Sequence, residues 1–114
     1  MLLPETNLRI WLYTEPTDMR KSYDGLSVVV KQKLKEDPLS GHLFVFINRK
    51  QTQMKILYFD RSGYCIWSKR LEQGQFHYRK DEVHKQPLDW ARLKMIIEGI
   101  DISQLRQFKR MDPV

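Results

Sequence analysis

The middle third of the chain contains three runs of apolar residues separated by short polar breaks. The first run, Leu43–Ile47, is apolar at every position, which is typical of a strand buried on both faces. The second and third runs, Met54–Phe59 and Tyr64–Lys69, are rich in aromatic and β-branched residues. The break between them, Asp60–Gly63, combines an Asp that favours turns with a Gly that tolerates positive φ. The pattern therefore predicts a three-strand antiparallel meander in which a tight hairpin joins the last two strands.

One strand and one helix are predicted before the meander. The strand covers Leu8–Tyr13 and ends before Pro16, because proline cannot donate a hydrogen bond to a ladder. The helix covers Ser22–Glu36, with Ser22 or Asp18 as its N-cap. Its apolar residues follow helical spacing along a single stripe. That stripe consists of Tyr23, Leu26, Val29, Val30 and Leu34.

A weaker strand, a loop and a second helix are predicted after the meander. The strand covers Phe76–Lys80, and the polar residues Asp81–Gln86 predict a loop. The helix starts after Asp89, a residue type that favours the N-cap, and runs to about Glu98. Gly99 then stands where a left-handed C-cap residue is expected.

The order of these elements, β-α-β-β-β-β-α, predicts the α+β class. We expect a mostly antiparallel sheet of four to five strands, with both helices packed on one face. Residues 1–101 form this single domain. Residues 102–114 are expected to form a basic C-terminal tail or a short docking helix, since Ile102, Leu105 and Phe108 recur at intervals of three.

The composition is that of one globular domain rather than of a disordered or membrane chain. The 114 residues are 41% hydrophobic and 11% aromatic, which is too apolar for wholesale disorder. The longest apolar run, Leu43–Ile47, is far shorter than the roughly 20 residues of a membrane helix. The first residues show no signal-peptide pattern and Cys65 is the single cysteine, so we expect a cytoplasmic protein without disulfides or membrane contact.

The basic charge balance adds a functional hint, because a net charge of +6 favours anionic partners such as nucleic acid. Arg20 and Lys21 precede a helix start, where cations oppose the helix dipole, so local stability does not explain them. An anion held between their side chains and the free N–H groups would explain them. The alternative is that Arg20 pairs with Asp18 or Asp24 while Lys21 is solvated.

Basic residues at the ends of the meander are expected to form one rim, since hairpin neighbours lie close in space. The rim comprises Arg49–Lys50, Lys55, Arg61, Lys69–Arg70 and Arg79–Lys80. Arg49 and Lys50 occupy a hairpin tip, and a two-stranded ribbon of this kind can enter a major groove. The residues interpreted as contacts for DNA phosphates are Arg20, Lys21, Arg49, Lys50, Arg61, Lys69 and Arg70.

Aromatic rings among these cations could stack on bases or line a groove. Tyr64 and Tyr78 are the candidates for this contact. Packing in the core or in a cross-strand pair is the alternative for any single ring. For Trp67 we expect the core, because large aromatic residues are mostly buried.

The sequence offers little for catalysis. No local Asp or Glu pairing has the spacing of a metal-binding loop, and the three histidines lack metal-ligand spacing with Cys65. A glycine-rich phosphate loop, a nucleophile elbow and a Cys–His signature are all missing. We therefore expect no enzyme activity, no metal and no cofactor. A metal nuclease dependent on Asp18 is the catalytic alternative.

Several ordered motifs resemble those of a known family. They are Asp18–Leu26, Gly41–Phe46, Lys55–Asp60, Gly63–Trp67 and Lys69–Phe76, followed by Leu93 and Glu98–Asp101. On these motifs the chain resembles the TnpB accessory protein of IS66-type bacterial insertion sequences, the product of the element's second reading frame. The likeness covers about residues 7–101. Ser22 stands where the family usually has Gly, and Phe59 where it often has Trp.

The resemblance implies a non-catalytic accessory role in transposition, beside a larger transposase that carries the strand-transfer carboxylates. From the charge pattern we expect the protein to bind DNA at the element's ends through a basic surface. The alternative is a protein-interaction module that docks on the transposase without touching DNA, through the stripe in residues 102–114 or an exposed face of the meander. A homodimer is compatible with both interpretations.

Overall fold

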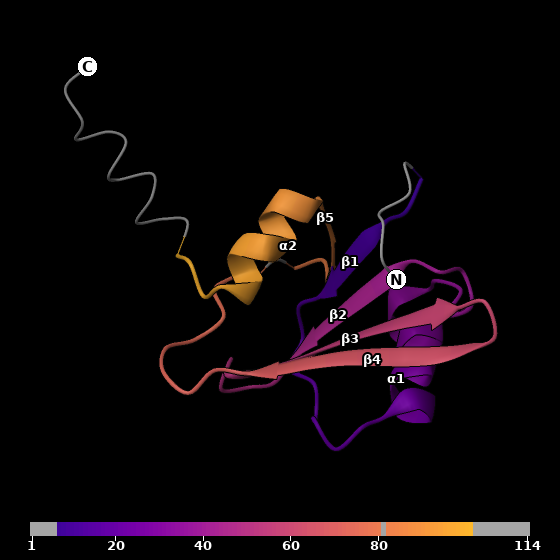
Figure 1. Cartoon of the computed structure of the whole chain (residues 1–114), viewed down its shortest axis with the longest axis horizontal. Helices are drawn as coiled ribbons and strands as arrows, with labels where there is room; N and C mark the ends of the chain where they lie inside the picture. The colour runs from indigo at the N-terminus through magenta and orange to yellow at the C-terminus, as the bar shows by residue number, and fades with distance from the viewer. Residues whose placement is uncertain (1–6, 81, 102–114) are drawn as a thin grey trace.

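The computed structural model describes residues 7–80 and 82–101, which build a five-stranded sheet in the order β4-β3-β2-β1-β5 (Figure 1). Its elements in chain order are β1 (Ile10–Tyr13), α1 (Tyr23–Val29), the π-helical turn η1 (Val30–Leu34), β2 (Leu43–Ile47), β3 (Gln53–Asp60), β4 (Gly63–Arg70), β5 (Lys85–Leu88) and α2 (Trp90–Ile97). The part of the chain that precedes residue 7 or follows residue 101, including the stripe expected in residues 102–114, lies outside the described residues.

The sheet is mostly antiparallel, which confirms the α+β class and the predicted meander of β2, β3 and β4. The exception is the pair β1 and β2, which run parallel with Ile10 opposite Leu43. Parallel neighbours need a crossover connection rather than a hairpin. Here α1 and η1 lie in that connection, and they occupy most of the predicted helix Ser22–Glu36.

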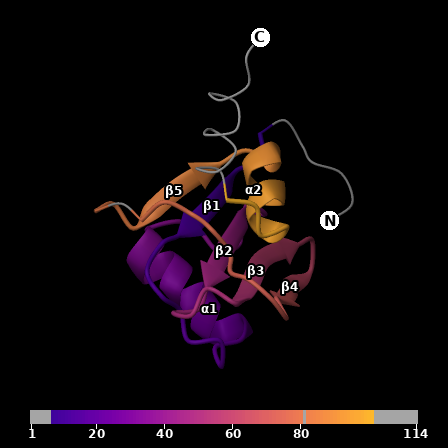
Figure 2. The ribbon, with the colours of Figure 1, turned by 90° about the vertical axis from the view of Figure 1, so that its left-hand side faces the viewer.

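The two helices cover opposite faces of the sheet, so the expectation that both pack on one face is wrong. Alternate residues of β2 point to opposite sides. Toward α2, a core cluster includes Leu43, Val45, Ile47, Leu93 and Ile96. Toward α1, the other cluster contains Leu26, Val30, Leu34, Phe44, Phe46 and Leu57. Figure 2 shows the sheet lying between α1 and α2. The physical reason is that a strand apolar at every position needs a cover on each side.

The fourth strand after the meander lies later in the chain than predicted. The segment Phe76–Lys80 is not a strand, although the side chain of Phe76 is fully buried in the core. The strand is instead β5, which begins inside the predicted loop Asp81–Gln86 and pairs antiparallel with β1. Pro87 is accommodated there because β5 is an edge strand.

A charged contact fixes β5 beside β1. The Lys85 ammonium lies 4.3 Å from the centroid of the Trp11 ring, a cation–π contact. The same ammonium forms an ion pair with Glu36, which follows η1. This pairing joins β1, β5 and the end of the helical crossover, and no spacing in the sequence indicates it.

Two details of β4 differ from the sequence predictions. In the hairpin that precedes it, Arg61 holds the positive φ of 56°, and Gly63 does not. Trp67, expected in the core, is 42% exposed. Its exposure follows from the position of β4 at the edge of the sheet, which the local pattern does not reveal.

The helix ends follow local chemistry. Ser22 is the N-cap of α1 by position, but its side chain makes no capping hydrogen bond. Asp89 caps α2 as predicted, because its carboxylate accepts a hydrogen bond of 2.7 Å from the backbone N–H of Arg92. Gly99 adopts positive φ beyond the helix, also as predicted.

None of the described helices has the length and apolar character required to cross a membrane.

The cap of α2 gives a direct stability test. Asp89→Ala should lower the free energy of unfolding by about 1 kcal/mol, since the N–H of Arg92 loses its acceptor. Urea denaturation followed by circular dichroism measures the change. Asp89→Asn keeps a capping oxygen and should retain most of the stability, so an equal loss in both variants would contradict the role of the cap.

Candidate nucleic-acid interface

The turn between β2 and β3 is held by its own side chains. Asn48 Oδ1 accepts hydrogen bonds from the backbone N–H groups of Thr52 and Gln53, at 2.9 and 3.0 Å. Gln51 takes the left-handed conformation with φ 61°, and its N–H donates to the Asn48 carbonyl at 3.0 Å. An Asn side chain that closes a turn in this way fixes the backbone locally. We call residues 48–52 the basic tip, because they carry Arg49 and Lys50.

The basic tip is also tied to the segment that follows β4. The backbone N–H of Phe76 donates to the Gln51 carbonyl at 2.7 Å, and Gln51 Nε2 donates back to the Phe76 carbonyl at 2.8 Å. Gln75 Nε2 donates to the Lys50 carbonyl at 2.8 Å. Phe76 is fully buried, so it anchors these bonds to the core. The tip therefore presents the exposed side chains of Arg49 and Lys50 from a fixed backbone.

A groove of about 870 Å³ separates the basic tip from the segment Pro16–Arg20. Arg20, Arg49 and Lys50 all line it, as does Asp18. The segment is fastened beside the tip because the backbone N–H of Thr17 donates to the Ile47 carbonyl, at 2.9 Å, where β2 ends. Three of the predicted phosphate contacts are thus brought together by two distant parts of the chain.

Arg20 and Asp18 form an ion pair, as one of the two sequence interpretations anticipated. Arg20 Nη2 lies 2.7 Å from Asp18 Oδ2, and Arg20 Nε lies 3.1 Å from each carboxylate oxygen. Hydrogen bonding from Arg20 lowers the pKa of the Asp18 carboxyl to about 2. The Arg20 side chain is still 92% exposed, so its guanidinium can contact a further anion. The pair as a whole contributes no net charge to the groove.

Lys55, which sequence reasoning placed in the rim but not in the site, positions Arg20 and Lys21. Its ammonium donates to the carbonyl of Met19 and to that of Lys21, each at 2.8 Å. These bonds fasten the turn before α1 to the sheet. The side-chain stem of Lys21 lies over Gly25, where an added Cβ would come within 3.2 Å of its Cβ and Cγ. No pattern of spacing could have indicated bonds from Lys55 to carbonyls 34 and 36 residues away.

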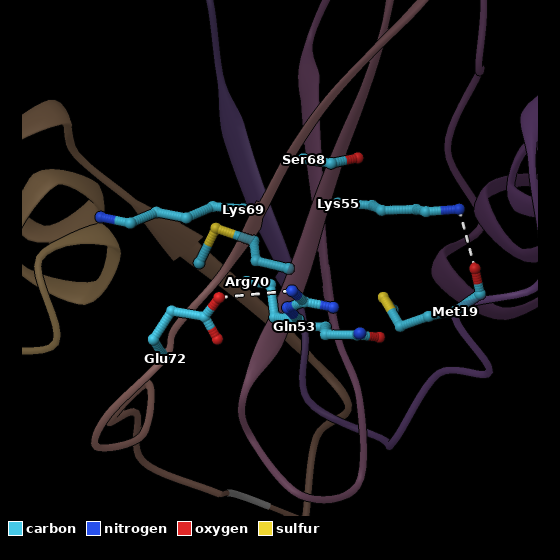
Figure 3. A pocket seen from close by; sticks show the side chains of 8 residues that line it. Met19, Gln53, Lys55, Ser68, Lys69, Arg70 and Glu72 are labelled. Atoms are coloured by element: carbon cyan, nitrogen blue, oxygen red, sulfur yellow. Dashed lines mark hydrogen bonds and ion pairs between the residues drawn. The ribbon is translucent and has the colours of Figure 1, made fainter.

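A second groove, of about 420 Å³, adjoins the first and shares Met19 and Gln53 with it. Lys69 and Arg70 line this groove (Figure 3). Figure 3 also shows Lys55 and Lys69 pointing in opposite directions. Lys69 donates to the carbonyl of Ile97 at 3.0 Å, at the end of α2, where a cation is favourable.

The predicted single basic rim is wrong, because Arg61 lies far from the other candidates. Arg61 follows β3 at its far end, whereas the basic tip precedes β3. Eight residues of strand separate the two turns, a span of roughly 25 Å. Arg70 has an ion pair of 3.3 Å with Glu72, so its charge is partly balanced. Arg20, Arg49 and Lys50 line the first groove, and Lys69 and Arg70 line the second, although the Lys69 ammonium is directed to the Ile97 carbonyl. Lys21 lines neither groove.

The two candidate tyrosines are built into the hydrophobic layers. Tyr64 packs against the cluster beneath α1 and makes an edge-to-face contact with Phe59, with ring centroids 5.3 Å apart. Tyr78 packs against the cluster beneath α2, and burial raises the pKa of its hydroxyl. Both partly buried rings therefore pack as the alternative in the sequence analysis expected, and their contact with bases stays a prediction.

The described residues contain no cluster of side chains able to bind a metal ion. Among them, no three His, Cys, Asp or Glu side chains come close enough together to hold a metal ion. Asp18, the residue named for a metal nuclease, faces Arg20 instead. The arrangement can bind anions through a fixed basic loop, but these residues do not assemble a carboxylate cluster.

Comparison with known proteins agrees with the motifs in the sequence. A family model described as IS66 Orf2-like protein matches residues 8–107. The uncharacterized protein y4hO of Sinorhizobium fredii is 37% identical over 89% of this chain and 88% of its own length. The uncharacterized protein y4jC of the same organism is 33% identical over 94% of the chain and 92% of its own length. No solved structure matches the chain significantly.

The ion pair in the groove predicts an acid titration. The Asp18 carboxyl should titrate near pH 2 in a nuclear magnetic resonance titration, because its pKa is lowered from 3.8 to about 2. Its stabilising effect is complete above the unfolded value of 3.8 and is lost as the pH falls through the folded value of about 2. Arg20→Gln should return the titration toward 3.8, and an unchanged titration would contradict the pairing.

Because the Lys55 ammonium holds the turn before α1, its removal should loosen that turn. Lys55→Met should make the Lys21 amide exchange with solvent roughly tenfold faster, since a bond from a charged donor contributes about 1.5 kcal/mol or more. Lys69→Met is the matched control, because that ammonium bonds to Ile97 on the other side of the sheet. The control should leave the Lys21 amide unchanged. Equal effects in both variants would show that Lys55 has no specific hold on this turn.

Proposed function

The chain belongs to the IS66 Orf2-like family of insertion-sequence accessory proteins, and from this premise we propose that it binds the DNA of the element's ends through the basic tip and its grooves. The family implies association with the element's transposition machinery. In this proposal the protein acts in the cytoplasm, beside a separate transposase that performs the strand transfer. Its own contribution is to hold DNA, without catalysis.

The observation that carries the proposal is the fixed presentation of Arg49 and Lys50. Both side chains are exposed, and neither guanidinium nor ammonium has an ion-pair partner among the described residues. Their backbone is ordered by Asn48 and Gln51 before any ligand arrives. A preorganised loop loses less conformational entropy on binding than a free one. Two uncompensated cations on such a loop suit two neighbouring phosphates.

The chemistry of the site favours the DNA backbone over the base edges. Base reading needs Asn, Gln or Arg side chains that reach the groove floor in a fixed orientation. In the basic tip, the amides of Asn48 and Gln51 are already bonded within the protein. The remaining side chains, Arg49 and Lys50, provide charge and length. Phosphate contacts fix orientation on a duplex without reading sequence, which suits an accessory protein.

Removing the two charges gives the central test of the proposal. Arg49→Ala combined with Lys50→Ala should lower the slope of log K against log salt by about two for DNA of the element's ends, since each phosphate contact contributes about 0.9. Affinity measured by fluorescence anisotropy at four or more salt concentrations gives this slope. The loop should still fold, because its internal bonds come from Asn48 and Gln51.

Arg61→Ala is the matched control for charge. Arg61 is exposed and cationic but lies at the opposite end of β3 from the basic tip. The control should leave the salt slope unchanged. If Arg61→Ala lowers the slope as much as the double substitution, the tip is not the DNA-binding surface. If the unaltered protein shows no salt-dependent binding to duplex DNA at all, the proposal is wrong.

The second candidate function is docking on the transposase without DNA contact. It is favoured by the fact that Arg20, Lys69 and Arg70 already have partners within the chain, which reduces the charge left for DNA. Co-purification with the transposase that survives nuclease treatment, together with no shift of DNA by the isolated protein, would select this function. The salt-slope experiment above separates the two candidates independently.

A further inference from the structure

The two edge strands of the sheet, β4 and β5, differ in how well they are protected against pairing with a further strand. Edge strands offer unpaired N–H and C=O groups, which proteins commonly blunt with proline, charge or short length. β5 is short, at four residues, and contains Pro87. β4 is eight residues long, contains no proline, and is uncharged from Gly63 to Ser68. Within the described residues, no strand pairs with the outer edge of β4.

The outer strand also exposes a large apolar side chain. Trp67 lies opposite Ile56 of β3, a residue of the cluster beneath α2, so it belongs to that face of the sheet. It is 42% exposed, whereas Ile56 is 5% exposed. An edge that is open for hydrogen bonding and carries an exposed tryptophan has the two features that strand addition uses.

We propose that the outer edge of β4 pairs antiparallel with β4 of a second copy of this chain, with Trp67 opposite Trp67. Such a pair has a twofold axis perpendicular to the sheet, so each face continues into the same face of the partner. The result is a continuous sheet of ten strands with the two indole rings covering each other. This proposal does not depend on DNA binding and would stand if the proposed function failed.

The placement of charge along β4 favours antiparallel over parallel pairing of two copies. The cations of the strand, Lys69 and Arg70, stand together at its C-terminal end. Parallel pairing would put like charges side by side, which is unfavourable. Antiparallel pairing about Trp67 places Lys69 opposite Cys65 and Arg70 opposite Tyr64 of the second copy. A guanidinium beside a tyrosine ring is a favourable contact.

The placement of charge and the exposed ring of Trp67 together select the register. The residues of β4 on the face of Trp67 are Gly63, Cys65, Trp67 and Lys69. Centring the pair on Cys65 would put Lys69 opposite Arg61, and centring it on Lys69 would put two lysines opposite each other. Centring on Gly63 would leave most of both strands unpaired. Among the centres on this face, Trp67 is the one that avoids like charges and brings the two exposed rings together.

Sedimentation velocity of the nuclease-treated protein tests the proposal. At about 100 μM the unaltered chain should sediment with twice the 13.8 kDa mass of one chain. Trp67→Glu should sediment as a single chain, because two carboxylates would face each other at the axis. Trp90→Glu is the matched control, since Trp90 is 39% exposed but lies on α2. This control should remain a dimer.

Two results would overturn the proposal: an unaltered chain that stays monomeric at this concentration, or a Trp67→Glu chain that stays dimeric. Circular dichroism distinguishes loss of pairing from loss of fold in the variants.

If Trp67→Glu fails to fold, crosslinking between two chains tests the proposed pairing instead. In a Cys65→Ser background, Trp67→Cys should form a disulfide between two chains on mild oxidation, because paired strands bring the two Cα atoms within disulfide range. Absence of that crosslink would also contradict the register.

The natural cysteine provides the control for crosslinking. Cys65 would face Lys69 of the second copy rather than another cysteine, so the unaltered chain should crosslink far less than the Trp67→Cys variant. Equal crosslinking in both chains would indicate random collision instead of the proposed pair. A dimer whose crosslinking favours Cys65 would place the axis on that residue and overturn the register.

Discussion

The burial of β2 on both faces is the constraint on which the rest of the structure depends. All five residues of this strand are fully or almost fully inaccessible to solvent, and alternate ones belong to different hydrophobic layers. A strand of this kind must have a neighbour on each side and a cover on each face. β1 and β3 supply the neighbours, while α1 and α2 supply the covers. The order of elements along the chain is one solution to that requirement.

The candidate interface is a consequence of where β2 ends. The carbonyl of Ile47, its last residue, holds Thr17, and Asn48 immediately begins the turn that carries the cations. The groove therefore forms between two segments that are both attached to a strand whose five residues are all buried. Its basic character comes from side chains that contribute nothing to the core, so charge at this position can vary without loss of the fold.

The sequence predicted those features that depend on neighbours in the chain. The three strands of the meander, the cap at Asp89 and the left-handed Gly99 follow from local pattern and were confirmed. The features that it missed depend on distant parts of the chain. They include the opposite faces of the helices, the exposure of Trp67 at an edge, the strand at Lys85–Leu88 and the bonds from Lys55 to the turn before α1. The separation of Arg61 from the basic tip already follows from the predicted meander, because consecutive turns lie at opposite ends of the strand between them.

The bonds between the basic tip and the chain after β4 have a mechanical consequence. Leu71, the residue directly after β4, donates its backbone N–H to the carbonyl of Thr52 in the tip at 2.8 Å. The end of the outer strand and the turn are therefore joined directly. Any movement of one that keeps this hydrogen bond must be followed by the other.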